Sequence, residues 1–422
     1  MEVTSGQDRI ILDFGWPLSS PTEDDIQKRL KRDTTQQLIA SKRIADIPGL
    51  YAHDTPSVKA VLLSHYHPDH YGFLSHIHKD IPIYSSVITG RVLALAYLFK
   101  QSPRISAKIS RLDPYKPFGG IPGFTITPYE TDHSAAGAFA FKIEATNEKK
   151  TLFYSGDLSG HLNKKYLFEK LLRYDWDIDC LILEGTNIQG RETPYKSEES
   201  VRDGFVKLFR ASSELAIVAC SSQNIDRLCS LYSASRGAKR TLVIDPYTAY
   251  ILDRVSIASK SIPQAGWDGI KVYFPEKSSY TRILQKVKPL FYNRFKKFEI
   301  SMDEIVKNRE KMVVKDSYYT RTALFEALGE AAPKPLVIYS LWEGYLDRDG
   351  GAWEKFGIRP EDMQKVHTSG HASRAELETL AATMTPRTLC PIHTQHPELF
   401  KEIFKGTEVK TFTPGTSIEF NI

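Results

Sequence analysis

The stretch that most constrains the fold is "SHYHPDHYG" at residues 64–72, which begins where the apolar run "KAVLLS" ends. It places three histidines and an aspartate within six positions of a chain that has 12 histidines in all. The apolar run predicts a buried strand, and Pro68 is typical of the first residue of a helix. Because side chains alternate along an extended segment, His65 and His67 point the same way. The stretch therefore predicts a strand, a loop and a helix start, with four ligand-type side chains at the carboxyl end of the strand, where α/β proteins build their sites.

Polar side chains also end the other strands that we predict in the first 185 or so residues, where β-branched runs alternate with helical patterns. Asp13 ends "DRIILDFG", Asp157 ends "KTLFYSGD", and Glu184 lies at the end of "DCLILEGT". His133 lies between two stretches, 124–134 and 136–145, that predict a strand pair; "IPIYSS" at 81–86 predicts a further strand. This part of the chain is therefore expected to be an α/β domain with its polar residues gathered at one edge.

A second series of predicted strands and helices occupies residues 188–364. Strand and helix patterns again alternate there, as in "LAIVACSSQNIDRLCSLYSASR" and "RTLVIDPYTAYIL", and residues 301–330 read as mostly helical. From residue 365, "QKVHTSGHAS", "AELETLAATM", "RTLCPIH" and "TSIEFNI" predict strand, helix, strand and strand that rejoin the first sheet. We therefore expect one domain, formed by residues 1–187 and 365–422, that is interrupted by a second domain at 188–364.

The strand-end residues form a set that suits metal ions. Imidazoles and carboxylates are ligands of Zn²⁺ and similar ions, and Mn²⁺ would use much the same site. Two ions about 3.5–4 Å apart need roughly six ligands and a bridging group, which this set supplies with one residue to spare. The set comprises Asp13, His65, His67, Asp69, His70, His133, Asp157 and His393.

These stretches resemble a known family. "SHYHPDHYG" resembles the HxHxDH signature of the metallo-β-lactamase fold, and "ILDFG", "TDHS" and "YSGD" resemble its other motifs in the same order. "ILEGT", "HTSGHAS" and "PIHT" resemble motifs A, B and C of the β-CASP nucleases, in particular their ribonuclease J-like branch, and "SSQNIDR" resembles a segment of their inserted domain. The resemblance implies a metallo-β-lactamase αββα sandwich with an inserted β-CASP α/β domain.

The resemblance also implies roles for individual residues. His65, His67 and His133 would hold one zinc ion, Asp69, His70 and His393 a second, and Asp157 would bridge them. Asp13 and Glu184 would orient neighbouring groups, because metal-bound imidazoles need a partner on their other nitrogen. Asp69, Glu184 and His371 are the expected catalytic residues, with His371 contacting the scissile phosphate or the leaving oxygen. Ser369, Gly370, His371 and Ser373 are candidates for binding a 5′-phosphate.

The implied function is that of a two-zinc ribonuclease, endonucleolytic, 5′-exonucleolytic or both. A water that bridges two zinc ions has a lowered pKa and can attack phosphorus in line. The expected partner is single-stranded RNA, with DNA as an alternative. The chain ends 29 residues after His393, so we expect it to lack the C-terminal dimerisation domain of many ribonuclease J-like proteins and leave its oligomeric state open.

Composition agrees with an ordinary globular protein. Hydrophobic residues make up 41% and charged residues 25%, and no apolar run approaches the roughly 18 residues of a membrane span. The N-terminus lacks the basic and apolar segments of a signal peptide, and the four cysteines form no CxxC pair, so we expect a cytoplasmic protein with reduced thiols. The net charge of +5 is mildly favourable for a polyanion. "QKRLKR" at 27–32 and "YNRFKKFE" at 292–299 could contact nucleic acid, although solvated helix faces explain both at least as well.

Two other functions stay open. The same ligands could serve a hydrolase of DNA or of a small phosphodiester, which a substrate panel at fixed salt would separate from a ribonuclease because polyanion binding falls steeply with salt. A non-enzymatic nucleic-acid-binding subunit is the weakest alternative, because every ligand position is intact. The sequence has no pattern that identifies recognition of the ribose 2′-hydroxyl.

Overall fold

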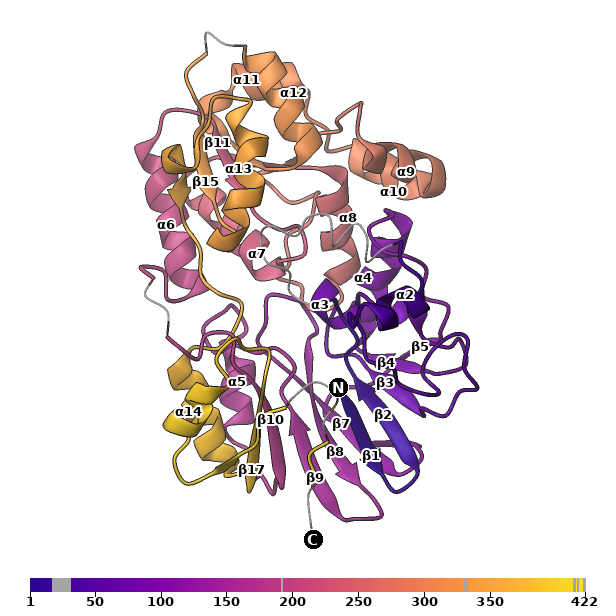
Figure 1. Cartoon of the computed structure of the whole chain (residues 1–422). Helices are drawn as coiled ribbons and strands as arrows, with labels where there is room; N and C mark the ends of the chain where they lie inside the picture. The colour runs from indigo at the N-terminus through magenta and orange to yellow at the C-terminus, as the bar shows by residue number, and fades with distance from the viewer. Residues whose placement is uncertain (17–31, 191–192, 330–331, 413–414, 416, 420–422) are drawn as a thin grey trace. The chain divides into compact units, whose positions relative to one another are not determined.

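The computed structural model describes the chain except for residues 17–31, 191–192, 330–331, 413–414, 416 and 420–422. The described residues divide into two compact units. Unit 1 comprises Met1–Glu192 and Gly370–Ile422, and unit 2 comprises Thr193–Ser369. The divisions lie five residues after those expected from the sequence, at 187/188 and 364/365. Figure 1 labels the elements used below.

Unit 1 contains two sheets. In the smaller sheet, β1 pairs antiparallel with β2, and β2 to β5 follow one another in parallel. In the larger sheet, β6 to β9 form an antiparallel meander, and β10, β17 and β18 extend it in parallel beyond β9. The strands are β1 (Glu2–Ser5), β2 (Asp8–Leu12), β3 (Ala60–Leu62), β4 (Ile83–Ser85), β5 (Ile109–Arg111), β6 (Phe118–Ile121), β7 (Phe124–Glu130), β8 (Phe139–Ala145), β9 (Lys150–Tyr154), β10 (Cys180–Glu184), β17 (Thr388–Ile392) and β18 (Glu408–Val409).

Alternation along the strands explains why these sheets form layers. Cys180 and Ile182 of β10 pack into the core shared with Ile10 and Leu62 of the smaller sheet. Leu181 and Leu183 of the same strand face the opposite way, into a core with the helices of unit 1. A strand that is apolar at every position is thus buried on both faces. These helices are α5 (Lys165–Leu171), α14 (Arg374–Met384) and α15 (Glu398–Ile403).

The remaining helices of unit 1 lie beside the smaller sheet (Figure 1). They are short and begin at polar caps where the sequence offers them. Thr34 forms a capping box with Gln37, and the Ser86 hydroxyl accepts the amide of Thr89. The helices are α2 (Thr35–Ala40), α3 (Pro68–Tyr71), the 3₁₀ turn η1 (Leu74–His76) and α4 (Val87–Leu98). The predicted arrangement of a two-sheet sandwich with outer helices is confirmed.

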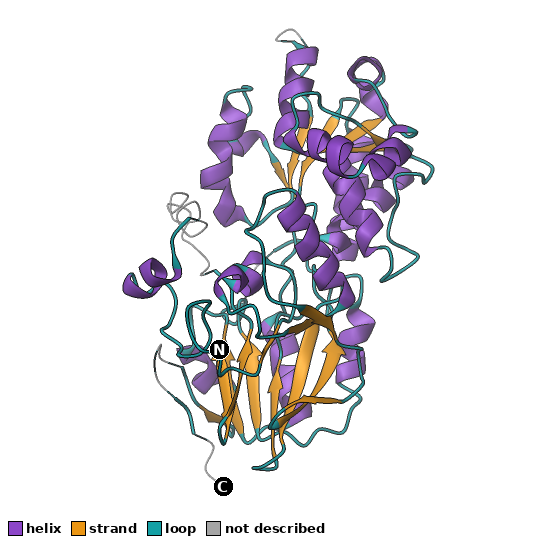
Figure 2. Ribbon diagram, turned by 90° about the vertical axis from the view of Figure 1, so that its right-hand side faces the viewer, coloured by secondary structure: helices purple, strands orange, loops and turns teal. Residues whose placement is uncertain are grey.

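Unit 2 is built on a parallel sheet in the order β13–β12–β14–β11–β15–β16. Helices lie on both of its faces (Figure 2). Its strands are β11 (Ala216–Ala219), β12 (Thr241–Ile244), β13 (Ile270–Val272), β14 (Met312–Lys315), β15 (Leu336–Tyr339) and β16 (Gln364–Lys365). Its helices are α6 (Glu198–Ala211), α7 (Ile225–Gly237), α8 (Pro246–Val255), α9 (Ser279–Val287), α10 (Pro289–Lys296), α11 (Met302–Lys307), α12 (Tyr318–Leu328) and α13 (Leu346–Glu354), with 3₁₀ turns η2 (Arg309–Lys311), η3 (Glu343–Tyr345) and η4 (Pro360–Asp362).

Residues 301–330 are mostly helical, as the sequence predicted, but this prediction was incomplete, and two other predictions were wrong. The segment 301–330 contains the buried strand β14 between its helices; its four residues "MVVK" are too short a run to stand out beside helical patterns. The expected strand at 364–373 is only β16, and it joins the sheet of unit 2 through β15 rather than the first sheet. Within the expected strand 416–422, residues 417–419 form no strand, and 416 and 420–422 lie outside the described residues; β18 is the last strand instead.

The described residues include no helix that is long and apolar enough to cross a membrane. The four cysteines are free; Cys180, Cys220 and Cys390 are buried and Cys229 is partly buried. Of the basic stretches, 27–31 lies outside the described residues. In 292–299, Arg294 pairs with Asp253 and lies 4.9 Å from the centre of the Phe291 ring. These contacts favour the solvated helix face over a nucleic-acid surface.

A buried ion pair stabilises unit 2. Arg227 on α7 is fully buried, and its Nη2 lies 2.8 Å from Oε1 of Glu198 on α6. The same guanidinium donates to the backbone oxygens of Ser340 at 2.9 Å and Thr368 at 3.2 Å. This arginine therefore joins α6, α7 and the two segments that follow β15 and β16.

We expect Arg227→Ala to lower the free energy of unfolding by about 3–5 kcal/mol, because it leaves the Glu198 charge buried and unpaired. The matched control is Arg202→Ala, whose partners Glu199 and Asp203 are exposed, and which should cost less than about 1 kcal/mol. Urea unfolding of the full chain measures both. Equal losses in the two variants would show that the buried pair has no special weight.

Candidate metal centre

The polar residues of "SHYHPDHYG" follow β3 as the sequence predicted. His67 is the N-cap of α3 in extended conformation, and Pro68 is the first helical residue. The chain therefore turns between His67 and Asp69, which brings side chains from the strand end and from the first helical turn to one place. His65 and His70 are buried, and their ring centroids lie 4.0 Å apart.

The structure brings His65, His67, His133 and Asp157 together. One ligand atom from each lies within 4.8 Å of the others. Nδ1 of His67 lies 3.0 Å from Nε2 of His65 and 3.2 Å from Nε2 of His133. His133 follows β7, and its other nitrogen, Nδ1, donates to the carbonyl of Gly370 at 2.8 Å. Three imidazole nitrogens thus converge, and the Gly370 carbonyl fixes the orientation of the His133 ring.

A second group contains Asp69, His70, Asp157 and His393, again with ligand atoms within 4.8 Å of one another. Nε2 of His393, which follows β17, lies 3.1 Å from Oδ2 of Asp69. Nε2 of His70 lies 3.1 Å from Oδ2 of Asp157. The chain therefore brings a residue more than 300 positions away beside the histidine stretch, because β17 pairs with β10 in the same sheet as β9.

Asp157 belongs to both groups and is the most unusual side chain among them. It is 1% exposed, and both of its carboxylate oxygens, like Nε2 of His70, have no hydrogen-bond partner among the described residues. Buried polar atoms are nearly always hydrogen-bonded, and an unpartnered one indicates a missing ion or water. Its Oδ2 lies 3.6 Å from Nε2 of His65 in the first group and 3.1 Å from Nε2 of His70 in the second. A carboxylate that nitrogens of both groups approach fits a ligand shared by two divalent cations.

Asp13 holds the histidine stretch from behind. Its Oδ1 accepts the amide of Ser64 at 2.7 Å, and its Oδ2 accepts from the hydroxyls of Ser64 and Tyr154 at 2.6 and 2.7 Å. Nδ1 of His70 donates to the same oxygen at 2.6 Å, which turns Nε2 of His70 toward Asp157. Ser64 and Tyr154, which the sequence analysis missed, thus share this carboxylate with His70.

Burial and neighbouring charges shift the pKa values of the histidines in opposite directions. Burial, reinforced by neighbouring imidazoles, holds the pKa of His65 well below its usual value, and burial lowers the pKa of His67 to about 4, so both are neutral, metal-binding imidazoles at pH 7. Burial also opposes charge on His70, but Asp157, Asp69 and Asp13 outweigh it and raise its pKa well above normal. The carboxylates therefore create a negative potential that positive charge must meet.

Glu184 and His371 lie beside these groups. Glu184 is fully buried at the end of β10; its Oε2 accepts the amide of Thr186 at 3.0 Å and its Oε1 the amide of Ala372 at 3.1 Å. Nδ1 of His371 lies 3.4 Å from Oε1 of Glu184. Burial disfavours the charged ring, but Glu184 and Asp157 outweigh this effect and raise the pKa of His371 to about 9. His371 is thus a cation at neutral pH, and Glu184 positions it.

Two residues that the sequence analysis missed contact His371 and its neighbours. Thr186 Oγ1 lies 2.7 Å from Nδ1 of His393 and 3.2 Å from Nδ1 of His371, so it joins both rings. Asn187 donates through Nδ2 to the carbonyls of His371 and Ala372 at 3.0 and 3.2 Å. Both follow Glu184 in the chain. Their position directly after Glu184 was the only indication of a role in the sequence, because a single threonine and a single asparagine form no recognisable ligand motif.

The candidate phosphate-binding residues lie in different settings. Gly370 accepts from His133 through its carbonyl. The Ser373 hydroxyl accepts the amide of Glu376 at 3.3 Å, and the Ser373 amide donates to that glutamate, so Ser373 caps α14. Ser369 is the last residue of unit 2. His161 contacts Glu376 and His396 contacts Glu398, and neither belongs to a candidate metal group in the described residues.

Two family models match the chain. A beta-lactamase superfamily domain matches residues 29–261, and a Zn-dependent metallo-hydrolase RNA specificity domain matches residues 357–414. A crystal structure of a protein of unknown function from Enterococcus faecalis V583 has the same fold, with a TM-score of 0.74 and 20% identity, covering 98% of this chain and 94% of that one.

Two curated proteins are similar in sequence. Ribonuclease J of Sinorhizobium meliloti is 22% identical over 364 residues, which are 82% of this chain and 61% of that protein. The DNA cross-link repair protein pso2/snm1 of Schizosaccharomyces pombe is 23% identical over 203 residues, 47% of this chain and 34% of that protein. The chain thus covers less than two thirds of either relative. Since the first family model spans more than half of the chain, and since the fold and the second model agree with it, the chain belongs to the beta-lactamase superfamily as a β-CASP metallo-hydrolase.

Proposed function

We propose that this chain is a two-zinc ribonuclease of the ribonuclease J-like branch, which hydrolyses RNA phosphodiester bonds internally, from the 5′ end, or in both ways. The observation that carries the proposal is the buried Asp157 carboxylate, which belongs to both groups of possible ligands and whose oxygens have no hydrogen-bond partner among the described residues. The similarity to a ribonuclease and the match to an RNA specificity domain at 357–414 support RNA as the substrate.

In this proposal, unit 1 is the metallo-β-lactamase domain and unit 2 the β-CASP domain. His65, His67 and His133 would hold one ion, Asp69, His70 and His393 would hold the other, and Asp157 would be shared by both. Manganese would suit the same donors. When bound, the ions supply Lewis-acid charge for the phosphoryl oxygens and acidify water at the site. The chain itself fixes the donors: Asp13 sets His70, the Gly370 carbonyl sets His133, and Thr186 sets His393.

His371 supplies the donor that a phosphodiesterase needs beyond its ions. Glu184 and Thr186 face Nδ1 of the ring and hold its orientation, and we propose that the ring donates to a phosphoryl or leaving oxygen. Glu184, the largest charged contributor, raises the pKa of His371 and so favours the protonated form that can donate. Asp69, beside His393 and 18% exposed, is the more accessible carboxylate of the cluster and is our candidate for proton transfer from water.

A DNA nuclease is the second candidate. The similarity to a DNA cross-link repair protein favours it, and the proposed chemistry at phosphorus would be identical. Nothing in the metal groups distinguishes ribose from deoxyribose, so the choice depends on residues that contact the sugar.

The first experiment compares cleavage of one RNA and one DNA of matching sequence, 5′-labelled as monophosphate or triphosphate, with zinc or manganese present. We expect RNA cleavage that falls at least a hundredfold in His65→Ala and persists in His53→Ala, whose ring is 42% exposed and outside the metal groups. Labelled mononucleotide released only from the 5′-monophosphate would indicate a 5′-exonuclease. Cleavage of DNA but not RNA would favour the second candidate, and cleavage of neither would contradict both.

A second prediction concerns Asp13→Asn. Asparagine tolerates the left-handed backbone that Asp13 adopts, with φ of 49°, but it lacks the second anionic oxygen that holds His70. We expect the zinc affinity to fall about 10- to 100-fold, as for other residues that orient metal ligands. Competition with a chromophoric chelator measures it. Asp80→Asn, at a carboxylate that is 67% exposed, is the control, and unchanged zinc affinity in Asp13→Asn would contradict the assigned role.

A third prediction concerns Thr186→Val, which keeps the branched side chain but removes the hydroxyl between His371 and His393. Losing one neutral hydrogen bond is worth up to about 1.5 kcal/mol, so we expect kcat for RNA to fall about fivefold to tenfold with KM within twofold. Thr186→Ser should restore kcat because it restores the hydroxyl. Full activity in the valine variant, or no recovery of kcat in the serine variant, would contradict the proposed role of the Thr186 hydroxyl.

A further inference from the structure

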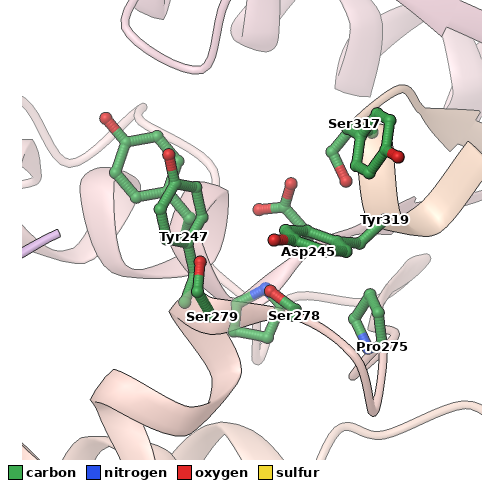
Figure 3. Close-up of a pocket in the computed structure, with 10 residues that line it drawn as sticks. Asp245, Tyr247, Pro275, Ser278, Ser279, Ser317 and Tyr319 are labelled. Carbon is green, nitrogen blue, oxygen red and sulfur yellow. The ribbon is translucent and has the colours of Figure 1, made fainter. Parts of the chain in front are cut away.

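Unit 2 contains a cavity of about 260 Å³ that the metal groups do not involve. We call it the tyrosine cavity, and it is lined chiefly by Asp245, Tyr247, Ser278, Tyr280, Tyr318 and Tyr319. Its volume lies just below the roughly 300–1,000 Å³ of sites for drug-sized ligands, so it suits one group of about nucleoside size. Figure 3 shows the Asp245 carboxylate with Tyr247 on one side and Ser317 and Tyr319 on the other.

The position of the cavity follows from the sheet of unit 2. The neighbouring parallel strands β13, β12 and β14 lead at their carboxyl ends into the loops that line it. Helices α8, α9 and α12 begin there, capped by Asp245, Ser278 and Ser317. Ligands of open parallel sheets bind at this edge, and helix N-termini carry partial positive charge that favours a phosphate.

The tyrosines form contacting pairs on the cavity wall. Tyr247 and Tyr280 have ring centroids 5.1 Å apart and an interplanar angle of 39°, and Tyr318 and Tyr319 lie 5.2 Å apart at 82°. Gln223 donates to the Tyr247 hydroxyl at 3.0 Å, which fixes that ring. Tyr318 is 58% exposed, and Nζ of Lys355 lies 4.9 Å from the centre of its ring. Aromatic faces of this kind are the surfaces on which nucleobases stack.

Asp245 gives the cavity its second property. The residue is 6% exposed, and its Oδ1 caps α8 by accepting the amide of Thr248 at 2.6 Å. A carboxylate has about four lone-pair sites, so it can still accept from a ligand that enters the cavity. The nearby Asp316 is neutralised by Arg321, at 2.9 and 2.6 Å. An isolated phosphate would be repelled by Asp245, whereas a group with O–H or N–H donors would be bound.

We propose that the tyrosine cavity binds a nucleotide, with its base on the tyrosine rings, a ribose hydroxyl or base N–H donating to Asp245, and its phosphate toward the first turns of α9 and α12. The base, the sugar and the phosphate of a nucleotide would each meet a suitable group in the cavity. An inorganic anion would use only the helix N-termini, and a purely apolar ligand would use only the tyrosine rings. The source is either a free mononucleotide or one nucleotide of a single-stranded chain. All the residues involved belong to unit 2, so this inference does not depend on the proposed ribonuclease activity.

The test measures the binding of adenosine 5′-monophosphate to the full chain by calorimetry, in EDTA so that metals and cleavage play no part. We expect Tyr319→Ala to weaken binding about tenfold and Tyr319→Phe to leave it within twofold, because phenylalanine keeps the stacking face. Trp342→Ala removes an aromatic ring that is 45% exposed and outside the cavity lining, and it should change nothing. Circular dichroism of each variant checks that it is folded.

Asp245→Asn is the sharpest variant. Asparagine caps a helix as well as aspartate, so α8 should survive. If the cavity attracted the nucleotide only by charge, removal of a negative group would tighten binding; the proposal expects it to weaken at least fivefold. A labelled 12-nucleotide RNA, titrated with the same variants, separates the sources: weakening for the mononucleotide alone indicates a free nucleotide, and weakening for the RNA indicates a nucleotide within a chain. Tighter binding in Asp245→Asn, or no effect of either variant on either ligand, would overturn the proposal.

Discussion

The arrangement of the candidate metal centre depends on how the buried, ionised carboxylate of Asp157 is stabilised. Burial opposes its ionisation, but His70, His393 and His371 face it and hold its pKa well below the usual range. An ionised carboxylate removed from water costs several kcal/mol unless opposite charges and hydrogen bonds surround it, and here hydrogen bonds to its oxygens are missing among the described residues. The facing imidazoles supply part of this compensation, and divalent cations suit the imidazole and carboxylate donors that surround Asp157.

The architecture of unit 1 explains how such a site can exist. The polar residues lie at or just after the ends of strands β2, β3, β7, β9, β10 and β17, and the segment after β3 alone contributes four of them. The strands themselves are held by the core between the sheets. The outer hydrogen bonds, from Asp13 to His70, from Gly370 to His133 and from Thr186 to His393, then fix which nitrogen of each ring faces inward. Rigid strands thus set the positions, and neighbouring polar groups set the orientations.

The sequence was most informative for residue types that seldom cluster at strand ends except at a functional site. Histidines and aspartates at strand ends could be predicted as one cluster because the strands of an α/β domain present their carboxyl ends at a common edge. Thr186, Asn187 and Tyr154 could not be predicted, because their roles depend on which loops meet and not on local pattern. Strand β14 and the pairing of β16 were not predicted for a related reason. Both strands are short, and their partner strands determine where they lie in the sheet. The tyrosine cavity likewise collects residues from three loops, none of which forms a motif by itself.

The central claim is that Asp157 joins two metal ions. X-ray data collected at the zinc absorption edge from crystals of the zinc-loaded protein test it most directly. The account predicts two anomalous peaks about 3.5–4 Å apart, one among His65, His67 and His133 and the other among Asp69, His70 and His393, with Asp157 bound to both. A single peak held by Glu184, His371 and His393, which also form a group of possible ligands, would contradict it.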